Sequence, residues 1–179
     1  VVTVVDPLPY MTYQPFLPEV VGGHIDGRHA VVDHATHLKD AELVRGAVVK
    51  VEHARRTATV QGPDGSEFEV PYQDIVMTAG ATTRTFPIPG LADAGIGLKT
   101  VEEAVALRNQ ILERLDAAAR MTDGEERKRA LTFVVVGGGF AGVEAIAEME
   151  DLIRNAVSRN PQLSQSEVRI AMVDRKSVV

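Results

Sequence analysis

Short runs of β-branched and aliphatic residues predict four buried strands. Runs this short, bounded by proline or small residues, are typical of strands rather than helices. The run at 131–136 has no polar break, which predicts a strand covered on both faces. The four runs are residues 1–5, ended by Asp6; 74–80, running into small residues; 131–136; and 168–173, ended by Asp174.

Between residues 43 and 72, apolar and polar positions alternate with a period of two. The turn-forming tract GPDG at 62–65 separates the second and third of these segments. Alternation broken by such turns predicts a three-stranded antiparallel β-meander. The alternating pairs are Val49 and Val51, Thr57 and Thr59, and Phe68 and Val70.

Apolar residues at helical spacing predict two long helices with a short one between them. The first begins at Thr100, which forms a capping box with Glu103, and the short helix is capped by Asp123. The second follows Gly142 and stops at Asn160. Their apolar faces would be Val101, Ala104, Val105, Ile111, Leu112, Leu115 and Ala118, and Val143, Ile146, Met149, Ile153 and Ala156. Residues 10–23 are expected to form an ordered loop or short helical turn closed by glycines.

The glycines after the strand at 131–136 fit the pattern G-x-G-x-x-G. A strand before it and a helix behind it make this match a dinucleotide-binding fingerprint. Gly137 would permit a tight turn, Gly139 would let the backbone approach a pyrophosphate, and Gly142 would let helix and strand pack closely. The helix N-terminus offers unpaired N–H groups to the anion. The alternative is a glycine turn that serves packing alone.

Asp174 and Glu144 are the charged candidates beside this loop. Asp174 would accept hydrogen bonds from the adenosine ribose, although it lies further from Gly142 than the usual spacing of about 20 residues. Its charge favours NAD, while Arg175 and Lys176 leave NADP open. Glu144 lies near the start of the helix, where it either compensates the helix dipole or contacts the nicotinamide end of the cofactor.

Asp6 repeats the arrangement of Asp174, a carboxylate at the end of a β-branched strand. It would be the ribose ligand of a second nucleotide, or it would start a turn before Pro7. Ala79 and Gly80 end their predicted strand without side-chain bulk, so a ligand could lie against the backbone there.

A histidine-rich stretch contains residue types that can bind a metal ion. No further cluster of ligands supports that reading, and a solvated face is favoured over metal binding. The stretch contains His29, Asp33, His34 and His37.

Composition narrows the classes of function. The 179 residues include 19 basic and 25 acidic ones, and a net charge of −6 argues against a nucleic-acid partner. No apolar run approaches the roughly 18 residues of a spanning helix, and no signal peptide is expected. The absence of cysteine excludes a disulfide framework, a thiolate zinc site and a redox-active cysteine pair within the chain.

Four segments resemble the two-dinucleotide-binding flavoproteins, most closely the type II NADH dehydrogenases, or NADH:quinone oxidoreductases. The resemblance implies an α/β, Rossmann-like two-dinucleotide-binding flavoprotein fold, here partial, that carries the β-meander. It also implies a partial FAD-binding domain over residues 1–97 and a partial NADH-binding domain with a leading helix over 98–179. The segments read VTVVD with YMTYQPFLPEVVGG, IVMTAGATTRTFPIPG, GLKTVEEAVALRNQILE and LTFVVVGGGFAGVEAIAE, in the family's order.

The resemblance also implies which residues hold each cofactor. FAD would be bound by Asp6 at the ribose, by Tyr13, Gln14 and Pro15 near the isoalloxazine, by the Val49 backbone near the adenine, and by Ala79 and Gly80. NADH would be bound by Gly137, Gly138, Gly139, Phe140, Ala141, Gly142 and Asp174, with Glu144 near the nicotinamide. The flavin carries the redox chemistry, so no side chain here need act as an acid or base.

The implied activity is hydride transfer from NADH to FAD and electron transfer onward to a quinone, without proton pumping. The missing cysteines point to a non-thiol acceptor. Two alternatives stay open: a related reductase with a protein or other non-thiol acceptor, and a non-catalytic NAD(H)-binding module.

The resemblance further implies a fragment of a respiratory enzyme. The family's first glycine loop, later FAD segment, quinone site and membrane-anchoring helices are not among these residues, so the fragment itself is expected to be inactive. The whole protein would lie peripherally on the cytoplasmic face of the cell membrane, and a homodimer is a further expectation.

Overall fold

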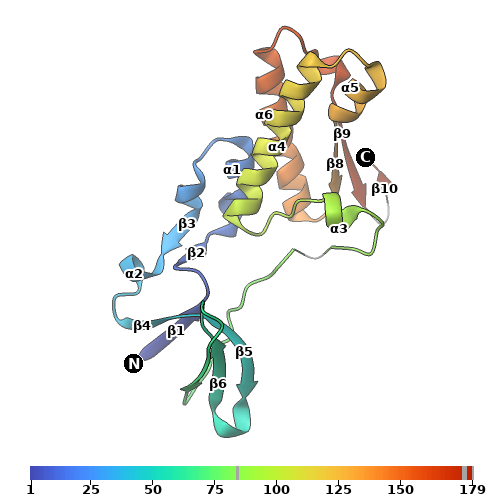
Figure 1. The fold of residues 1–179 in the computed structure, drawn as a ribbon. Helices are drawn as coiled ribbons and strands as arrows, with labels where there is room; N and C mark the ends of the chain where they lie inside the picture. Colours follow the sequence, from blue (N-terminus) through green and yellow to red (C-terminus); the bar gives the residue numbers. More distant parts are fainter. Residues whose placement is uncertain (84, 175–176, 179) are drawn as a thin grey trace. The chain divides into compact units, whose positions relative to one another are not determined.

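The computed structural model describes residues 1–83, 85–174 and 177–178, which form two compact units (Figure 1). The first unit is built from Val1–Thr12 and Val31–Ala81, and the second from Tyr13–Ala30 and Thr82–Val179. These units do not follow the sequence boundary expected at residue 97. The assignment of 1–97 to FAD and 98–179 to NADH therefore stays a prediction about cofactors.

The first unit is mainly β-structure. Strands β1 and β4 pair in parallel, β2 and β3 pair antiparallel, and β5, β6 and β7 form an antiparallel sheet in that order. Its elements are β1 (Val2–Asp6), β2 (Tyr10–Thr12), β3 (Val31–Asp33), α2 (His34–His37), β4 (Ala41–Arg45), β5 (Ala47–Glu52), η3 (His53–Arg55), β6 (Thr57–Gln61) and β7 (Glu67–Pro71).

The sheet β5–β6–β7 confirms the predicted β-meander. The register of β5 against β6 shifts between Val48 and Lys50, so Val49 is an extra residue in a β-bulge. A bulge of this kind leaves one residue outside the ladder and bends the strand locally. The predicted alternating region began at residue 43, and the prediction did not recognise β4 as a separate strand. β4 pairs with β1 and not with the meander.

Two of the strand predictions in this unit need correction. Residues 74–80 contain no strand, and the side chain of Val76 is 83% exposed. A strand needs a hydrogen-bonded neighbour, and none of the described strands pairs with this segment. For the same reason β1 is not buried as predicted, because β4 is its one partner among the described strands and Val2 stays exposed.

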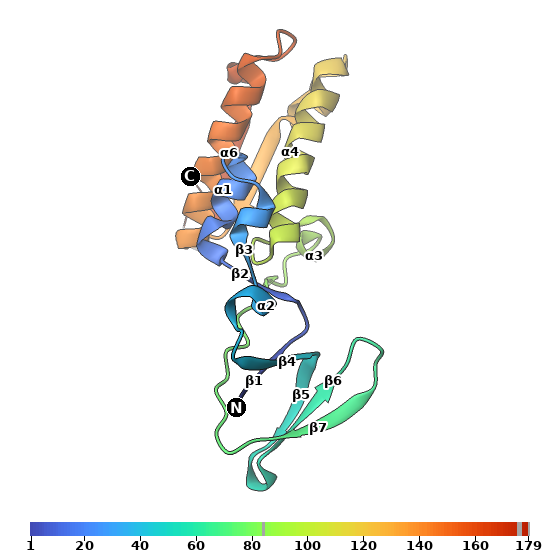
Figure 2. The same cartoon turned by 90° about the vertical axis from the view of Figure 1, so that its left-hand side faces the viewer.

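The second unit packs helices against a short sheet. Figure 2 shows α4 and α6 running side by side, and α1 packs against both of them. Strands β8 and β9 pair in parallel, with β10 antiparallel on the outer edge of β9. The elements are η1 (Gln14–Phe16), α1 (Leu17–Gly22), η2 (Gly27–Ala30), α3 (Leu91–Ala94), α4 (Val101–Arg120), α5 (Gly124–Ala130), β8 (Thr132–Val136), α6 (Phe140–Ser158), η4 (Gln165–Glu167), β9 (Arg169–Asp174) and β10 (Ser177–Val178).

Local sequence signals explain where these helices start and stop. The hydroxyl of Thr100 accepts from Glu103 N at 3.1 Å and the Glu103 carboxylate accepts from Thr100 N at 3.1 Å, which confirms the capping box. Asp123 accepts from the first-turn N–H groups of α5, as predicted. Gly23, with φ at +78°, ends α1.

One hydrophobic core holds the second unit together. Leu17, Ile111 and Ile153 of α1, α4 and α6, and Leu131 between α5 and β8, are each at most 1% exposed. Within α6 the buried positions are Ala145, Met149, Ile153 and Val157. The predicted face placed Val143 inside, but this side chain is exposed because it lies on the side of α6 opposite Ala145.

Strand β8 is covered on one face and not on both. Phe133 enters the core, whereas Val134 on the opposite face is 54% exposed. The continuous apolar run therefore correctly predicted a strand, but the prediction that both faces of this strand are covered was wrong. None of the described helices has both the length and the apolar character needed to cross a bilayer.

Candidate functional site: the glycine loop between β8 and α6

The glycine loop joins the ends of two parallel strands. Gly137 adopts φ +116°, a conformation that favours glycine, and its N–H donates to Val173 O of β9 at 2.9 Å. This hydrogen bond ties the end of β8 to the end of β9 and sends the chain sharply into α6. The predicted role of Gly137 in a tight turn is what this geometry provides.

Gly142 lies where helix and loop touch. A Cβ built on Gly142 would lie 2.1 Å from the carbonyl oxygen of Gly137 and 3.7 Å from Val135 Cγ1. Any side chain at this position would collide with backbone, so glycine is what lets the first turn of α6 pack on β8. Gly139 differs, because nothing lies within 4 Å of its hypothetical Cβ. The space beside Gly139 is open for a ligand to approach the backbone.

The N-terminus of α6 presents N–H groups without competing carboxylates. Gly139 is the N-cap and makes no side-chain cap hydrogen bond, and the first turn contains no acidic residue. Gly142 N and Val143 N both donate to Gly139 O at 3.0 Å, while Phe140 projects outward with 93% exposure. A helix of 19 residues carries partial positive charge at this end, which suits a phosphate group.

Glu144 does not sit in the first turn. It is the fifth residue of α6 and its side chain is exposed. Interaction with the helix dipole falls off within the first turn, so compensation of the dipole is not its role. Contact with the nicotinamide end of a cofactor, the other alternative, stays a prediction.

Asp174 lies beside the glycine loop. β8 and β9 run in parallel with Val136 opposite Val173, so Asp174 follows at the same edge of the sheet as the loop. A Cβ built on Gly138 would lie 3.3 Å from Asp174 Cβ. The structure thus brings together the glycines and the carboxylate that the sequence pointed to. Arg175 and Lys176, which left NADP open, lie outside the described residues.

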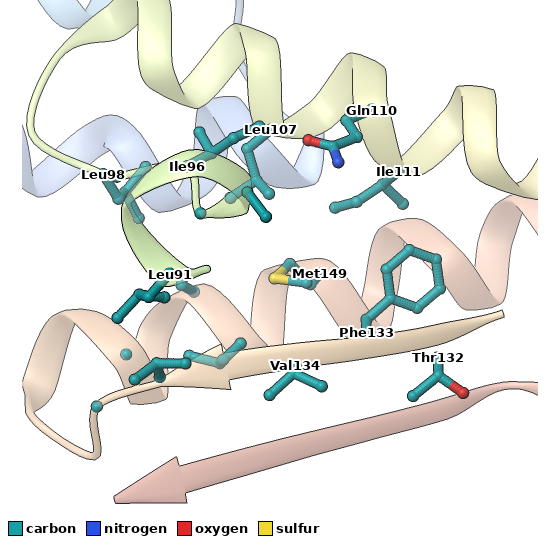
Figure 3. Close-up of a pocket in the computed structure, with 18 of the residues that line it drawn as sticks. Leu91, Ile96, Leu98, Leu107, Gln110, Ile111, Thr132, Phe133, Val134 and Met149 are labelled. Atoms are coloured by element: carbon teal, nitrogen blue, oxygen red, sulfur yellow. The ribbon is translucent and has the colours of Figure 1, made fainter. Parts of the chain in front are cut away.

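A cavity of about 950 Å³ opens next to the loop (Figure 3). Apolar side chains of α3 and the segment after it, of α4, of β8 and of α6 line it, and it reaches the backbone of Gly137 and Gly139. The sequence predicted several of these residues as apolar faces but not as a cavity wall, because their spacing does not distinguish a cavity wall from a core. The labelled side chains include Leu91, Ile96, Leu98, Leu107, Ile111, Phe133, Val134 and Met149.

Asp6, at the end of β1, is held by two contacts. Its Oδ1 accepts from Leu8 N at 2.8 Å. This hydrogen bond forms the turn that was the alternative role predicted for Asp6. Its Oδ2 lies 3.2 Å from His34 Nε2 at the start of α2. A carboxylate has about four lone-pair sites, so these two contacts leave acceptor capacity for a ribose. The turn and the ribose site are compatible with each other.

The other predicted FAD residues belong to both units. In the first unit, Val49 is the bulged residue of β5, and Ala79 and Gly80 form exposed backbone with φ +67° at Gly80. In the second unit, the segment of Tyr13, Gln14 and Pro15 leads into α1.

That segment is well anchored. Tyr13 N donates to Ala30 O at 2.7 Å, and its ring meets Phe16 edge-on with centroids 4.9 Å apart. Gln14 Nε2 donates to Lys99 O at 3.2 Å, while Pro15 lies in the first turn of η1. Whether these residues contact a flavin stays a prediction.

The histidine-rich stretch has contacts of its own. Asp33 caps α2 by accepting from Thr36 N at 2.8 Å and Thr36 Oγ1 at 2.6 Å. The hydrogen bonds from Thr36, with smaller contributions from the neighbouring histidines, lower the pKa of Asp33. Within 1–83, 85–174 and 177–178, no three histidine or acidic side chains gather as a metal site would require. The contact between His34 and Asp6 carried no sequence signal, since 28 positions separate them.

Comparison with known proteins adds a family match. Residues 1–176 match the family model described as pyridine nucleotide-disulphide oxidoreductase. The computed structure resembles that of NDH2 from Plasmodium falciparum in complex with NADH, with a TM-score of 0.87 at 24% identity over 95% of this chain and 36% of that one. This likeness confirms the predicted α/β flavoprotein fold, with its three-stranded antiparallel sheet, as a partial fold.

Curated relatives match over nearly the whole chain. The external alternative NAD(P)H-ubiquinone oxidoreductase B2 of Arabidopsis thaliana is 33% identical over 97% of this chain and 31% of its own length. The type II NADH:quinone oxidoreductase NdhA of Mycobacterium tuberculosis is 31% identical over 93% of this chain and 36% of its own. The chain therefore spans about a third of the relatives that it matches.

Proposed function

The chain belongs to the pyridine nucleotide-disulphide oxidoreductase family, and from this premise we propose that it is part of an FAD-dependent NADH:quinone oxidoreductase. The whole protein would oxidise NADH, reduce FAD and pass electrons to a quinone without pumping protons. The similarity to ubiquinone and quinone oxidoreductases supports the acceptor. The 179 residues contain no cysteine, which agrees with an acceptor other than a thiol.

The observation that carries the proposal is the unit made by β8, the glycine loop, α6 and β9. Backbone geometry there requires glycine at Gly137 and Gly142, leaves open space beside Gly139, and places Asp174 next to Gly138. The N–H groups of the α6 N-terminus would bind the pyrophosphate of NADH, and Asp174 would accept hydrogen bonds from the adenosine ribose. These donors and acceptors fit a dinucleotide.

We propose that the FAD residues are those expected from the family resemblance. Asp6 would hold the adenosine ribose with its remaining acceptor capacity, and the bulge at Val49 would present backbone to the adenine. Tyr13, Gln14 and Pro15 would position the isoalloxazine, while Ala79 and Gly80 offer exposed backbone to the flavin nucleotide.

Bound FAD would supply the redox chemistry between NADH and the quinone. The residues of this chain bind and orient the two nucleotides. Exposed Glu144 would lie at the nicotinamide end, where it would restrict how the ring approaches, and Phe140 would contact NADH at the glycine loop. Orientation of this kind raises the rate without any side chain transferring a proton.

The location and assembly of the whole protein are part of the same proposal. We infer peripheral association with the cytoplasmic face of the cell membrane, because a quinone acceptor dissolves in the bilayer while NADH is water-soluble. Segments beyond this chain would provide the membrane contact. A homodimer is proposed on the family resemblance alone.

A stopped-flow experiment on the full-length protein tests the proposal. Flavin absorbance should bleach when NADH is added without oxygen, and it should return when a soluble quinone is added. Reduction that only a protein acceptor can reverse would favour the related reductase. Binding of NADH by a protein without flavin would favour the non-catalytic module and contradict the proposal.

The Asp174→Leu variant tests, in the same experiment, whether Asp174 binds the ribose of NADH. Loss of the ribose contact should raise the KM for NADH about 10-fold or more, as expected when a hydrogen bond to a charged group is lost. The matched control is Asp151→Leu, an exposed carboxylate on the same unit in the middle of α6. Equal KM values for the two variants would show that Asp174 does not bind the ribose.

A further inference from the structure

The carboxylate of Asp6 has a neighbour that no family pattern pointed to. His34 Nε2 lies 3.2 Å from Asp6 Oδ2, and the two side chains are 13% and 34% exposed respectively. The imidazole is therefore the more buried partner. An ionised carboxylate offers only acceptors. The tautomer assigned to His34 therefore carries a hydrogen on Nε2, and this N–H donates a hydrogen bond to Asp6.

The backbone around His34 is fixed in place. His34 N donates to Pro9 O at 3.0 Å, which ties the start of α2 to the segment that follows β1. Asp33, the N-cap of α2, holds the first turn through Thr36. An imidazole carried on such an anchored turn has little freedom to leave Asp6.

The second oxygen of Asp6 is fixed independently. Oδ1 accepts from Leu8 N at 2.8 Å, and the backbone oxygen of Asp6 accepts from Gly46 N at 3.1 Å. Together with His34, these contacts fix both the residue and the rotation of its carboxylate. Arg45 lies opposite Asp6 in the β1–β4 pair.

We propose that His34 is a positioning residue for the nucleotide-binding carboxylate of Asp6. This inference rests on the proposed function, in which Asp6 binds the adenosine ribose of FAD. His34 donates to Oδ2 and Leu8 N donates to Oδ1, so the rotation of the carboxylate is fixed before a ribose binds. A carboxylate oriented before the ligand arrives loses less entropy on binding.

A double-mutant cycle in FAD affinity tests this role. The full-length apoprotein and its variants His34→Leu, Asp6→Asn, the double variant and His34→Gln are titrated with FAD, with quenching of flavin fluorescence as the readout. We expect His34→Leu to weaken FAD binding about 10-fold. In the Asp6→Asn background the same change should cost less than about 2-fold, because His34 acts through Asp6.

Rescue and control variants separate positioning from folding. His34→Gln keeps an N–H donor close to the position of Nε2 and should retain wild-type affinity within about 2-fold. His37→Leu removes an exposed imidazole from the same helix and should leave affinity unchanged. Thermal melting of each apoprotein shows which variants fold.

The outcomes distinguish this inference from the proposed function. If Asp6→Asn weakens FAD binding while His34→Leu does not, or if the two effects simply add, His34 does not position Asp6 and the inference is wrong. If the wild type binds FAD but Asp6→Asn has no effect, the ribose assignment of Asp6 fails, and this inference fails with it. Should His34→Leu not fold, His34→Gln decides: a loss of affinity of more than about 2-fold in a folded His34→Gln protein contradicts the positioning role.

Discussion

Replacing Gly142 with alanine should disturb the nucleotide site through the backbone alone. The new Cβ would lie 2.1 Å from Gly137 O, whereas non-bonded heavy atoms prefer about 3.5 Å, so α6 or the loop must move by about 1.4 Å. Overpacking of this kind costs about 1–3 kcal/mol, or roughly a 5- to 150-fold change in the unfolding equilibrium. The N–H groups of the α6 N-terminus would move with the loop, and NADH affinity should fall about 10-fold or more.

Gly139→Ala provides the contrast within the same loop. Nothing lies within 4 Å of its Cβ and its φ is −77°, so alanine fits the free protein without strain. Stability should change by less than about 1 kcal/mol, the cost of an alanine at an N-cap. NADH affinity should still fall if the backbone approaches the pyrophosphate at this point, because the methyl group occupies the ligand's space.

Gly124→Ala is the matched control, since its Cβ also meets nothing within 4 Å and Gly124 lies in α5, away from the loop. Thermal unfolding and fluorescence titration with NADH are measured for all three variants of the full-length protein. The expected order of stability places Gly142→Ala well below the other two. Equal melting temperatures for Gly142→Ala and Gly124→Ala would refute the close packing of α6 on the loop.

Three further predictions concern the stability of the second unit. Ile153→Ala removes a side chain that is 1% exposed and should cost about 2–5 kcal/mol in chemical denaturation, whereas a cost below about 1 kcal/mol would contradict its place in the core. Thr100→Ala should cost about 1 kcal/mol through the lost cap of α4, and Thr100→Ser should restore it. Arg127 holds the pKa of Glu167 below its usual value of 4.5 by hydrogen bonding, so the stabilisation is complete at neutral pH and is lost as the pH falls below that value. Melting curves between neutral and acid pH should therefore show a smaller acid loss in Glu167→Gln than in the wild type, and equal losses would count against the pair.

The strand–glycine loop–helix–strand unit was predictable because its signals are local. The apolar run before Gly137, the glycine spacing and the carboxylate at the end of β9 each depend on a few consecutive residues. The backbone then uses the glycines as the pattern predicts, with a positive φ at Gly137 and no room for a side chain at Gly142. Capping residues such as Thr100 were predictable for the same reason.

The errors arose where pairing partners decide the outcome. Residues 74–80 have the composition of a strand, but no described strand pairs with them. The parallel pairing of β4 with β1 joins segments almost 40 positions apart, which alternation cannot reveal. The misplaced start of α6 had another cause, because a helix whose third residue is Gly142 reads as loop until the backbone is seen. That shift moved Glu144 out of the first turn, whereas Val143 is exposed because it lies on the face of α6 opposite Ala145.

The two aspartates that looked equivalent in sequence are held in different ways. Both end a strand that pairs in parallel, β1 with β4 and β9 with β8. Asp6 is fixed by donors to each carboxylate oxygen, from Leu8 N and His34 Nε2. Asp174 instead lies against Gly138, where the absence of a side chain leaves it room. A carboxylate fixed in advance suits a cofactor that stays bound, whereas one with space to adjust suits a substrate that binds and leaves at every turnover. This difference is compatible with the proposed binding of FAD at Asp6 and of NADH at Asp174.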